Sequence, residues 1–147
     1  MESILEKAKK IAEEAEVFMV SSEETSVQFE ANRLKHVQSK QSTSVALRII
    51  KEGKIGYATT TGLDNGQNLV NMAVESAQFG MAAEFEFPPL TSFPRVNILD
   101  PATEAVSIET MTGLGEEMIT AVRVNTPDLL CEAAVSRGTS TIRIINS

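Results

Sequence analysis

Arg48 is the residue whose type and position best suit a binding role, because it interrupts an apolar, alternating stretch from Ala46 to Ile50. In a strand, its side chain would point to the face opposite Leu47 and Ile49. A guanidinium there can bind a carboxylate or form an ion pair with an acidic residue on a neighbouring strand. Of these two roles, the cross-strand ion pair is the simpler interpretation.

Three consecutive threonines, Thr59 to Thr61, end the stretch that returns from Arg48 through Tyr57. A nucleophilic hydroxyl requires an adjacent base, and the sequence places none beside these threonines. The pattern instead indicates the end of a strand, with hydroxyls able to cap the turn before the next helix.

Metal-ligating and nucleophilic residues are scarce. A catalytic zinc ion needs three protein ligands, and His36 is the single histidine of the chain. Cys131 lies in the apolar stretch "LLCEAA" without a nearby histidine to generate a thiolate, so packing is its expected role. The sequence therefore predicts neither a zinc site nor a cysteine nucleophile.

Other patterns that resemble sites are also weak. The acidic pairs at 13–14, 23–24 and 116–117 are adjacent, so on a helix their side chains diverge by about 100° and share no proton. The run Gly113-Leu114-Gly115 lacks the preceding strand and the third glycine of a dinucleotide fingerprint.

The first half of the chain reads as one helix followed by strands. Apolar residues at helical spacing predict a helix over 2–16, and alternation predicts strands near 16–21, 25–31 and 34–40. We expect a polar turn at 21–24 and another at Asn32-Arg33.

The strongest local prediction is a hairpin over 45–60, with Gly53 at a positive-φ turn position and Gly56 at either a bulge or a close backbone approach. A helix should follow from Asp64 or Asn65 to about Ala83, with small residues that allow it to lie close on a sheet.

Residues 84–101 hold four of the five prolines and three phenylalanines, which predicts an extended, semi-rigid connector. A helix is expected over 101–124, then a second hairpin turning at 136–139. Consecutive strands joined by short turns predict an α+β fold with a mainly antiparallel sheet of hairpins covered by helices. The length of 147 residues predicts one domain spanning 1–147.

Charge and composition restrict the class of protein. The formal net charge of −7 and pI near 4.8 argue against direct nucleic-acid binding. The basic run from Arg33 to Lys40 carries no interleaved aromatic for base stacking. The longest apolar runs are far shorter than the ~20 residues of a membrane span, the N-terminus carries no signal-peptide core, and a single cysteine agrees with a reducing compartment. We therefore expect a cytoplasmic protein without membrane contact.

Three stretches together resemble one known family. The central stretch "SVALRIIKEGKIGYATTTGLDNGQNLVNMAVESA" resembles the N-terminal domain of the TldD/PmbA family, with its glycine-turn hairpin, G-(F/Y)-A-x-T and following helix. The upstream "TSVQFEANRLKHVQSKQ" and the stretch from Asp100 to Ser147 are similar to flanking parts of the same domain. The similarity is nearer to PmbA-type proteins, also described as modulators of DNA gyrase or peptide-maturation proteins.

The resemblance carries expectations about function. Family members are known as metallopeptidases whose TldD-type subunit holds zinc on an H-E-x-x-x-H motif and pairs with a PmbA-type partner. That motif has no counterpart here, so the resemblance assigns no metal or catalytic residue to this chain, and we expect the chain alone to be inactive. The family pattern continues past Asn146-Ser147, which implies an N-terminal fragment of a longer protein, with zinc in its C-terminal part.

Within that resemblance, Arg48, Tyr57, Thr59 and Thr61 are expected to face a peptide or a partner subunit. The implied partners are a peptide or unfolded protein substrate and a TldD-type subunit or a second copy. Any effect on gyrase would run through proteolysis of a third protein, since DNA contact is disfavoured. The alternative is a free-standing module that binds a protein partner through an edge strand. A weaker option is a small-molecule enzyme that uses Arg48 and nearby hydroxyls.

Overall fold

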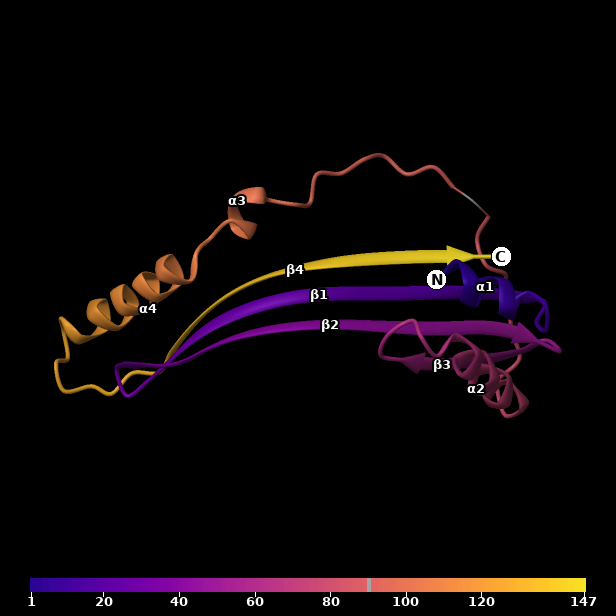
Figure 1. Ribbon diagram of the computed structural model, residues 1–147, viewed down its shortest axis with the longest axis horizontal. Coiled ribbons are helices and arrows are strands. Elements are labelled where there is room, and N and C mark those ends of the chain that lie inside the picture. Colours follow the sequence, from indigo (N-terminus) through magenta and orange to yellow (C-terminus); the bar gives the residue numbers. More distant parts are fainter. Residues whose placement is uncertain (90) are drawn as a thin grey trace. The chain divides into compact units, whose positions relative to one another are not determined.

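A computed structural model describes residues 1–89 and 91–147; Leu90, within the predicted connector, lies outside the described residues. The described residues form four strands and four helices (Figure 1). In chain order these are α1 (Glu2–Ala8), β1 (Glu14–Glu30), β2 (Arg33–Lys51), β3 (Lys54–Thr60), α2 (Gly66–Gln78), α3 (Pro101–Glu104), α4 (Ile108–Arg123) and β4 (Ala133–Asn146). None of these helices is long and apolar enough to cross a membrane.

The strands form one sheet in the order β3-β2-β1-β4, and the predicted α+β class is confirmed. β2 and β3 pair antiparallel, with Val45 opposite Thr60 and Lys51 opposite Lys54. Their turn holds Glu52 and Gly53 at φ of 51° and 69°, so the predicted positive-φ role of Gly53 is confirmed.

The predicted turn at 21–24 is wrong, because β1 runs through it without interruption. The polar residues there pair across the sheet with polar residues of β2. The Ser21 and Thr43 hydroxyls lie 2.9 Å apart, and the Gln41 amide donates to Glu23 Oε2 at 3.2 Å. No glycine, proline or asparagine is present to make a turn, and hydroxyl side chains are compatible with strand pairing.

The predicted second hairpin is also wrong, because β4 is a single strand through 136–139. Gly138 has a packing role instead of a turning role. A Cβ at Gly138 would lie 3.1 Å from the backbone oxygen of Glu23, so the missing side chain permits a close backbone approach.

Three predicted helices are shorter in the structure. The first ends at Ala8 rather than 16, because Ala15 and Val17 are fully buried as part of β1. The second ends at Gln78 rather than Ala83. The predicted helix over 101–124 is two helices, α3 and α4. The Asp100 side chain accepts a hydrogen bond from Ala102 N, and that of Ser107 accepts one from Thr110 N, so each helix has its own N-cap.

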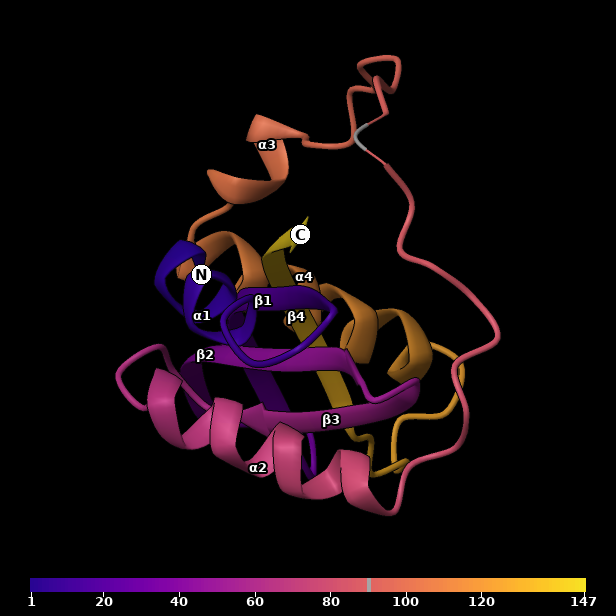
Figure 2. The ribbon, with the colours of Figure 1, turned by 90° about the vertical axis from the view of Figure 1, so that its right-hand side faces the viewer.

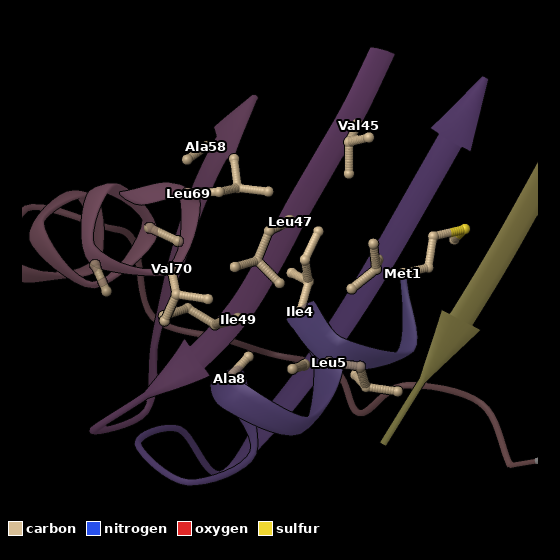
Figure 3. Close-up of a cluster of buried hydrophobic side chains, with 14 residues drawn as sticks. Met1, Ile4, Leu5, Ala8, Val45, Leu47, Ile49, Ala58, Leu69 and Val70 are labelled. Atoms are coloured by element: carbon tan, nitrogen blue, oxygen red, sulfur yellow. The ribbon is translucent and has the colours of Figure 1, made fainter. Parts of the chain in front are cut away.

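The contacts divide the described residues into two compact units. Unit 1 comprises 1–21, 42–95 and 140–147, and unit 2 comprises 22–41 and 96–139. In unit 1, side chains from α1, α2, β1, β2 and β3 form one buried cluster (Figure 3). Its members are Met1, Ile4, Leu5, Ala8, Ala15, Val17, Val45, Leu47, Ile49, Ala58, Leu69, Val70, Ala73 and Ala77.

In unit 1, α2 lies alongside β3 (Figure 2), and two glycines permit this contact. A Cβ at Gly56 would lie 2.2 Å from the backbone oxygen of Ala73, and one at Gly80 would lie 1.9 Å from that of Ile55. Of the two roles predicted for Gly56, the close backbone approach is therefore confirmed.

In unit 2, a smaller cluster joins β1 to α4. Val27 and Phe29 of β1 pack with Met111 and Ile119 of α4. Gly115 lies against the Phe29 ring, where a Cβ would lie 2.1 Å from ring atom Cε2. The small residue thus lets the helix approach the aromatic side chain.

Candidate functional site

Arg48 forms the cross-strand ion pair that the sequence favoured as the simpler interpretation. Its Nη2 donates to Glu16 Oε1 on β1 at 2.8 Å. The Arg48 side chain is 44% exposed and that of Glu16 is 19% exposed. The pair therefore lies at the surface of the sheet, where one side of the guanidinium remains open to other groups.

Two aromatic rings from the connector occupy that open side. The guanidinium carbon of Arg48 lies 5.1 Å from the ring centroid of Phe85 and 4.9 Å from that of Phe87. The two rings lie edge to face, with centroids 5.8 Å apart and planes at 66°. Both distances fall within the range of cation–π attraction.

The main chain of the same segment is held by polar side chains. Phe87 N donates to Glu14 Oε2 at 2.8 Å, and Asn146 Nδ2 donates to the Pro88 carbonyl at 2.8 Å. We call residues Phe85–Pro88 the strap. Its partners come from β1, β2 and β4, so three strands hold one extended segment. The sequence predicts an extended connector that contains these phenylalanines, and no local signal in it links them to Arg48.

Tyr57 lies directly opposite Arg48 in the antiparallel register. Its side chain is 69% exposed. Thr59 is exposed two residues further along β3, and alternation places it on the same face as Tyr57. Thr61 is exposed in the bend after β3. The structure thus brings Arg48, Tyr57 and Thr59 to one face of the sheet, and Thr61 lies beyond the strand.

The outer edge of β3 is covered over its first half by the chain itself. Ile55 N donates to the Met81 carbonyl at 2.9 Å, and Ala83 N donates to the Gly53 carbonyl at 2.8 Å. Tyr57 N reaches the Ser76 hydroxyl at 3.4 Å. By alternation, Thr59 is the next residue of β3 whose N–H points outward.

A hollow of about 360 Å³ lies beside the turn between β2 and β3, in unit 1. Its lining includes Lys51 and Lys54, whose ammonium groups donate to the carbonyls of Ile11 at 2.8 Å and Gln78 at 3.0 Å. Both ammonium groups are therefore already engaged in holding main-chain segments against the sheet.

The remaining sequence candidates lie apart from this face. His36 is exposed on β2, and Cys131 packs half-buried against the cluster of unit 2. Among residues 1–89 and 91–147, no group of three or more histidine, cysteine or carboxylate side chains is close enough to hold a metal ion.

Residues 15–77 match the family model described as PmbA/TldA metallopeptidase domain 1. Over this stretch the chain is similar to a PmbA/TldD first domain. The stretch contains β2, β3 and most of α2, and with them Arg48, Tyr57, Thr59 and Thr61. The strap lies outside the matched residues.

Known proteins share the fold of this chain over nearly its whole length. TldE from Thermococcus kodakarensis covers 100% of this chain with a TM-score of 0.86 at 15% identity. A candidate modulator of a DNA gyrase from Thermotoga maritima covers 99% with a TM-score of 0.79 at 16% identity. An uncharacterized protein of Methanocaldococcus jannaschii is 29% identical over 153 residues, which cover 97% of this chain. In each case the chain spans 34% of the length of the relative.

Proposed function

We propose that this chain serves as the N-terminal domain of a TldD/PmbA-type metallopeptidase subunit, where it supports peptide binding or subunit pairing and cuts no peptide by itself. The match of residues 15–77 to a metallopeptidase first domain carries this proposal. The exposed face of Arg48, Tyr57 and Thr59 supports it, since that face lies within the matched residues. We further propose a cytoplasmic location and assembly with a TldD-type subunit or a second copy.

The proposed role in catalysis is to hold a peptide, while zinc belongs to the partner or to the rest of the longer protein. Bound zinc in a peptidase activates a water molecule and polarises the carbonyl of the peptide bond. No residue of this chain is proposed as a zinc ligand. An effect on gyrase, where one occurs, would follow from proteolysis of a third protein rather than from DNA contact.

The open half of the β3 edge offers a way to hold an extended peptide. Main-chain hydrogen bonds to an edge strand give affinity, and side chains on alternate positions give specificity. The chain's own Met81–Ala83 segment already pairs with the first half of this edge. A peptide would continue that pairing at Tyr57–Thr60 and lie beside the Thr59 hydroxyl.

Thr59→Pro tests this function in the protein assembled with a TldD-type subunit and zinc. Proline removes the outward N–H of an edge position and leaves the β2–β3 pairing bonds in place. We expect KM for an unstructured peptide to rise severalfold, while Thr59→Val, which keeps the N–H, raises KM by clearly less. Thermal unfolding checks that both variants fold.

The other proposed roles give different results in the same assay. An unchanged KM in Thr59→Pro would exclude peptide binding at β3. Loss of assembly in that variant on a sizing column would instead indicate subunit pairing at β3. An assembly that forms but cuts no peptide would exclude the peptidase role. It would favour the edge-strand interaction module, which the outward N–H of Thr59 also suits.

A further inference from the structure

The strap is attached to the sheet, but much of the strap remains exposed at the surface. Phe85 is 41% exposed, and Arg48 also forms an ion pair with Glu16 that does not involve the rings. Residues 88, 89 and 91–105 are all exposed. Release of the strap would therefore expose no buried side chain among these connector residues.

Each contact with the strap is made to a chemical group that other extended peptides also carry. Glu14 accepts a main-chain N–H, and Asn146 donates to a main-chain carbonyl one residue later. In an extended chain, side chains at i and i+2 point to the same side, which brings both rings to one guanidinium. The three side chains contact an aromatic residue, a second aromatic residue two positions later and the main-chain carbonyl of the residue after it, which is Pro88 in the strap.

We propose that Glu14, Arg48 and Asn146 form a binding site for extended peptides with an aromatic-x-aromatic pattern, and that the strap occupies the site as an internal competitor. The inference rests on the proposed peptide-binding function and names its ligand class and its control. The acidic residue between the two aromatics, Glu86 in the strap, is exposed, so the site leaves that position unspecified.

Tethering explains how a small contact can block the site. A segment joined to its site by a short chain acts at an effective concentration of about millimolar. A peptide from outside then binds only the fraction of molecules whose strap is released, and its apparent Kd rises in inverse proportion to that fraction. Removing the aromatic rings of the strap should remove this penalty.

The test measures binding of a fluorescein-labelled peptide, Glu-Phe-Glu-Phe-Pro-Pro, by fluorescence anisotropy. The variants are Phe85→Ser with Phe87→Ser, and the same pair combined with Arg48→Met. The double variant should bind at least about tenfold more tightly than the unchanged protein, the factor expected when the strap is docked in about nine of ten molecules. Adding Arg48→Met should abolish that gain.

A matched control replaces two phenylalanines that lie outside the site. Phe79 is 90% exposed and Phe93 is 82% exposed, so the pair Phe79→Ser and Phe93→Ser should leave peptide affinity unchanged. Circular dichroism and thermal unfolding verify folding of every variant. A peptide in which serines replace both phenylalanines should not bind the strap-released protein.

Three results overturn the inference: equal peptide affinity with and without the strap rings, equal affinity with and without Arg48, or equal affinity for the serine peptide. The Thr59→Pro assay tests peptide binding at the β3 edge and not at the Arg48 site. It therefore distinguishes failure of the proposed function from failure of this inference. If removal of the strap rings does not change peptide affinity but Thr59→Pro raises KM, the proposed function stands and this inference fails. If Thr59→Pro leaves KM unchanged but removal of the strap rings raises peptide affinity, only peptide binding at the β3 edge is excluded.

Discussion

The two units of the chain differ in how much apolar surface they bury. Fourteen buried side chains form the cluster of unit 1, whereas four form the cluster of unit 2 within the described residues. On α4 of unit 2, Leu114, Met118 and Val122 remain exposed beside the buried Met111 and Ile119. Since burial of apolar surface is the main stabilising term, unit 2 should open locally at a lower free energy than unit 1.

Leu47→Ala should be the most damaging single change. Leu47 is fully buried at the centre of the larger cluster, and such a truncation costs about 2–5 kcal/mol of unfolding free energy. Chemical denaturation measures the loss. Hydrogen exchange should show faster opening throughout unit 1.

Met111→Ala is the counterpart in unit 2. Its cost should lie near the lower end of about 2–5 kcal/mol, because a cluster of four side chains collapses more readily around the lost volume. Faster exchange should be confined to unit 2. Equal losses in both variants, with exchange altered throughout, would show that the two units unfold together.

Gly56→Ala should cost about 1–3 kcal/mol, since the new methyl group would meet the backbone oxygen of Ala73 and displace α2 from β3. Gly115→Ala meets only the Phe29 side chain and should cost less. Gly113→Ala is the control, because its Cβ would contact nothing within 4 Å. Thermal unfolding of the three variants should give that order. A stable Gly56→Ala protein would contradict the close contact between α2 and β3.

Ser107→Ala tests a single helix cap in unit 2. The Ser107 hydroxyl accepts from Thr110 N at 3.1 Å, and loss of such a cap costs about 1 kcal/mol. Ser136→Ala, at an exposed position on β4, should be neutral. If the two variants unfold at the same denaturant concentration, α4 does not depend on its cap.

The smallest effect is expected at the exposed pair of Glu30 and Lys35, whose charged atoms lie 2.9 Å apart. The hydrogen bond and charge of Lys35 lower the pKa of Glu30, and Glu30 raises the pKa of Lys35. Stability from Glu30 is present above its ordinary pKa and lost as pH falls through the lowered value. Stability from Lys35 is present below its ordinary pKa and lost as pH rises through the raised one. In Lys35→Met, an NMR titration should find the Glu30 pKa moved up towards its ordinary value; an unmoved pKa would mean that the ion pair does not form in solution.

Local signals in the sequence predicted the hairpin at Gly53 and the close approach at Gly56, because each depends on the backbone freedom of a single glycine. The same reasoning failed at 21–24 and 136–139. The polar residues 21–24 and 136–139 lie within β1 and β4, where they contact neighbouring strands of the sheet. A local sequence pattern does not identify those partner strands. Helix ends failed for a similar reason, since burial of Ala15 and Val17 in β1 outweighs the helical spacing around them.

The candidate site was predictable in part. Alternation placed Arg48 on the face opposite Leu47, and the observed partner Glu16 is the acidic cross-strand neighbour that the pattern suggested. Its aromatic partners could not be predicted, because Phe85 and Phe87 lie beyond β3 and α2 in the chain. Their approach depends on Glu14 and Asn146, from opposite ends of the sequence.

Asn32, in the turn between β1 and β2, bonds to a segment that is synthesised much later. Its amide donates to the Leu129 carbonyl at 3.1 Å, and its Oδ1 accepts from Cys131 N at 2.8 Å. β2 ends at Lys51, whereas β4 begins at Ala133, 82 residues later. At 5–20 residues per second, the β1–β2 hairpin therefore waits roughly 4–16 s with the β4 side of β1 unpaired. During that interval the nascent hairpin presents an open strand to other chains, which makes this stage the one at which a chaperone would be most useful.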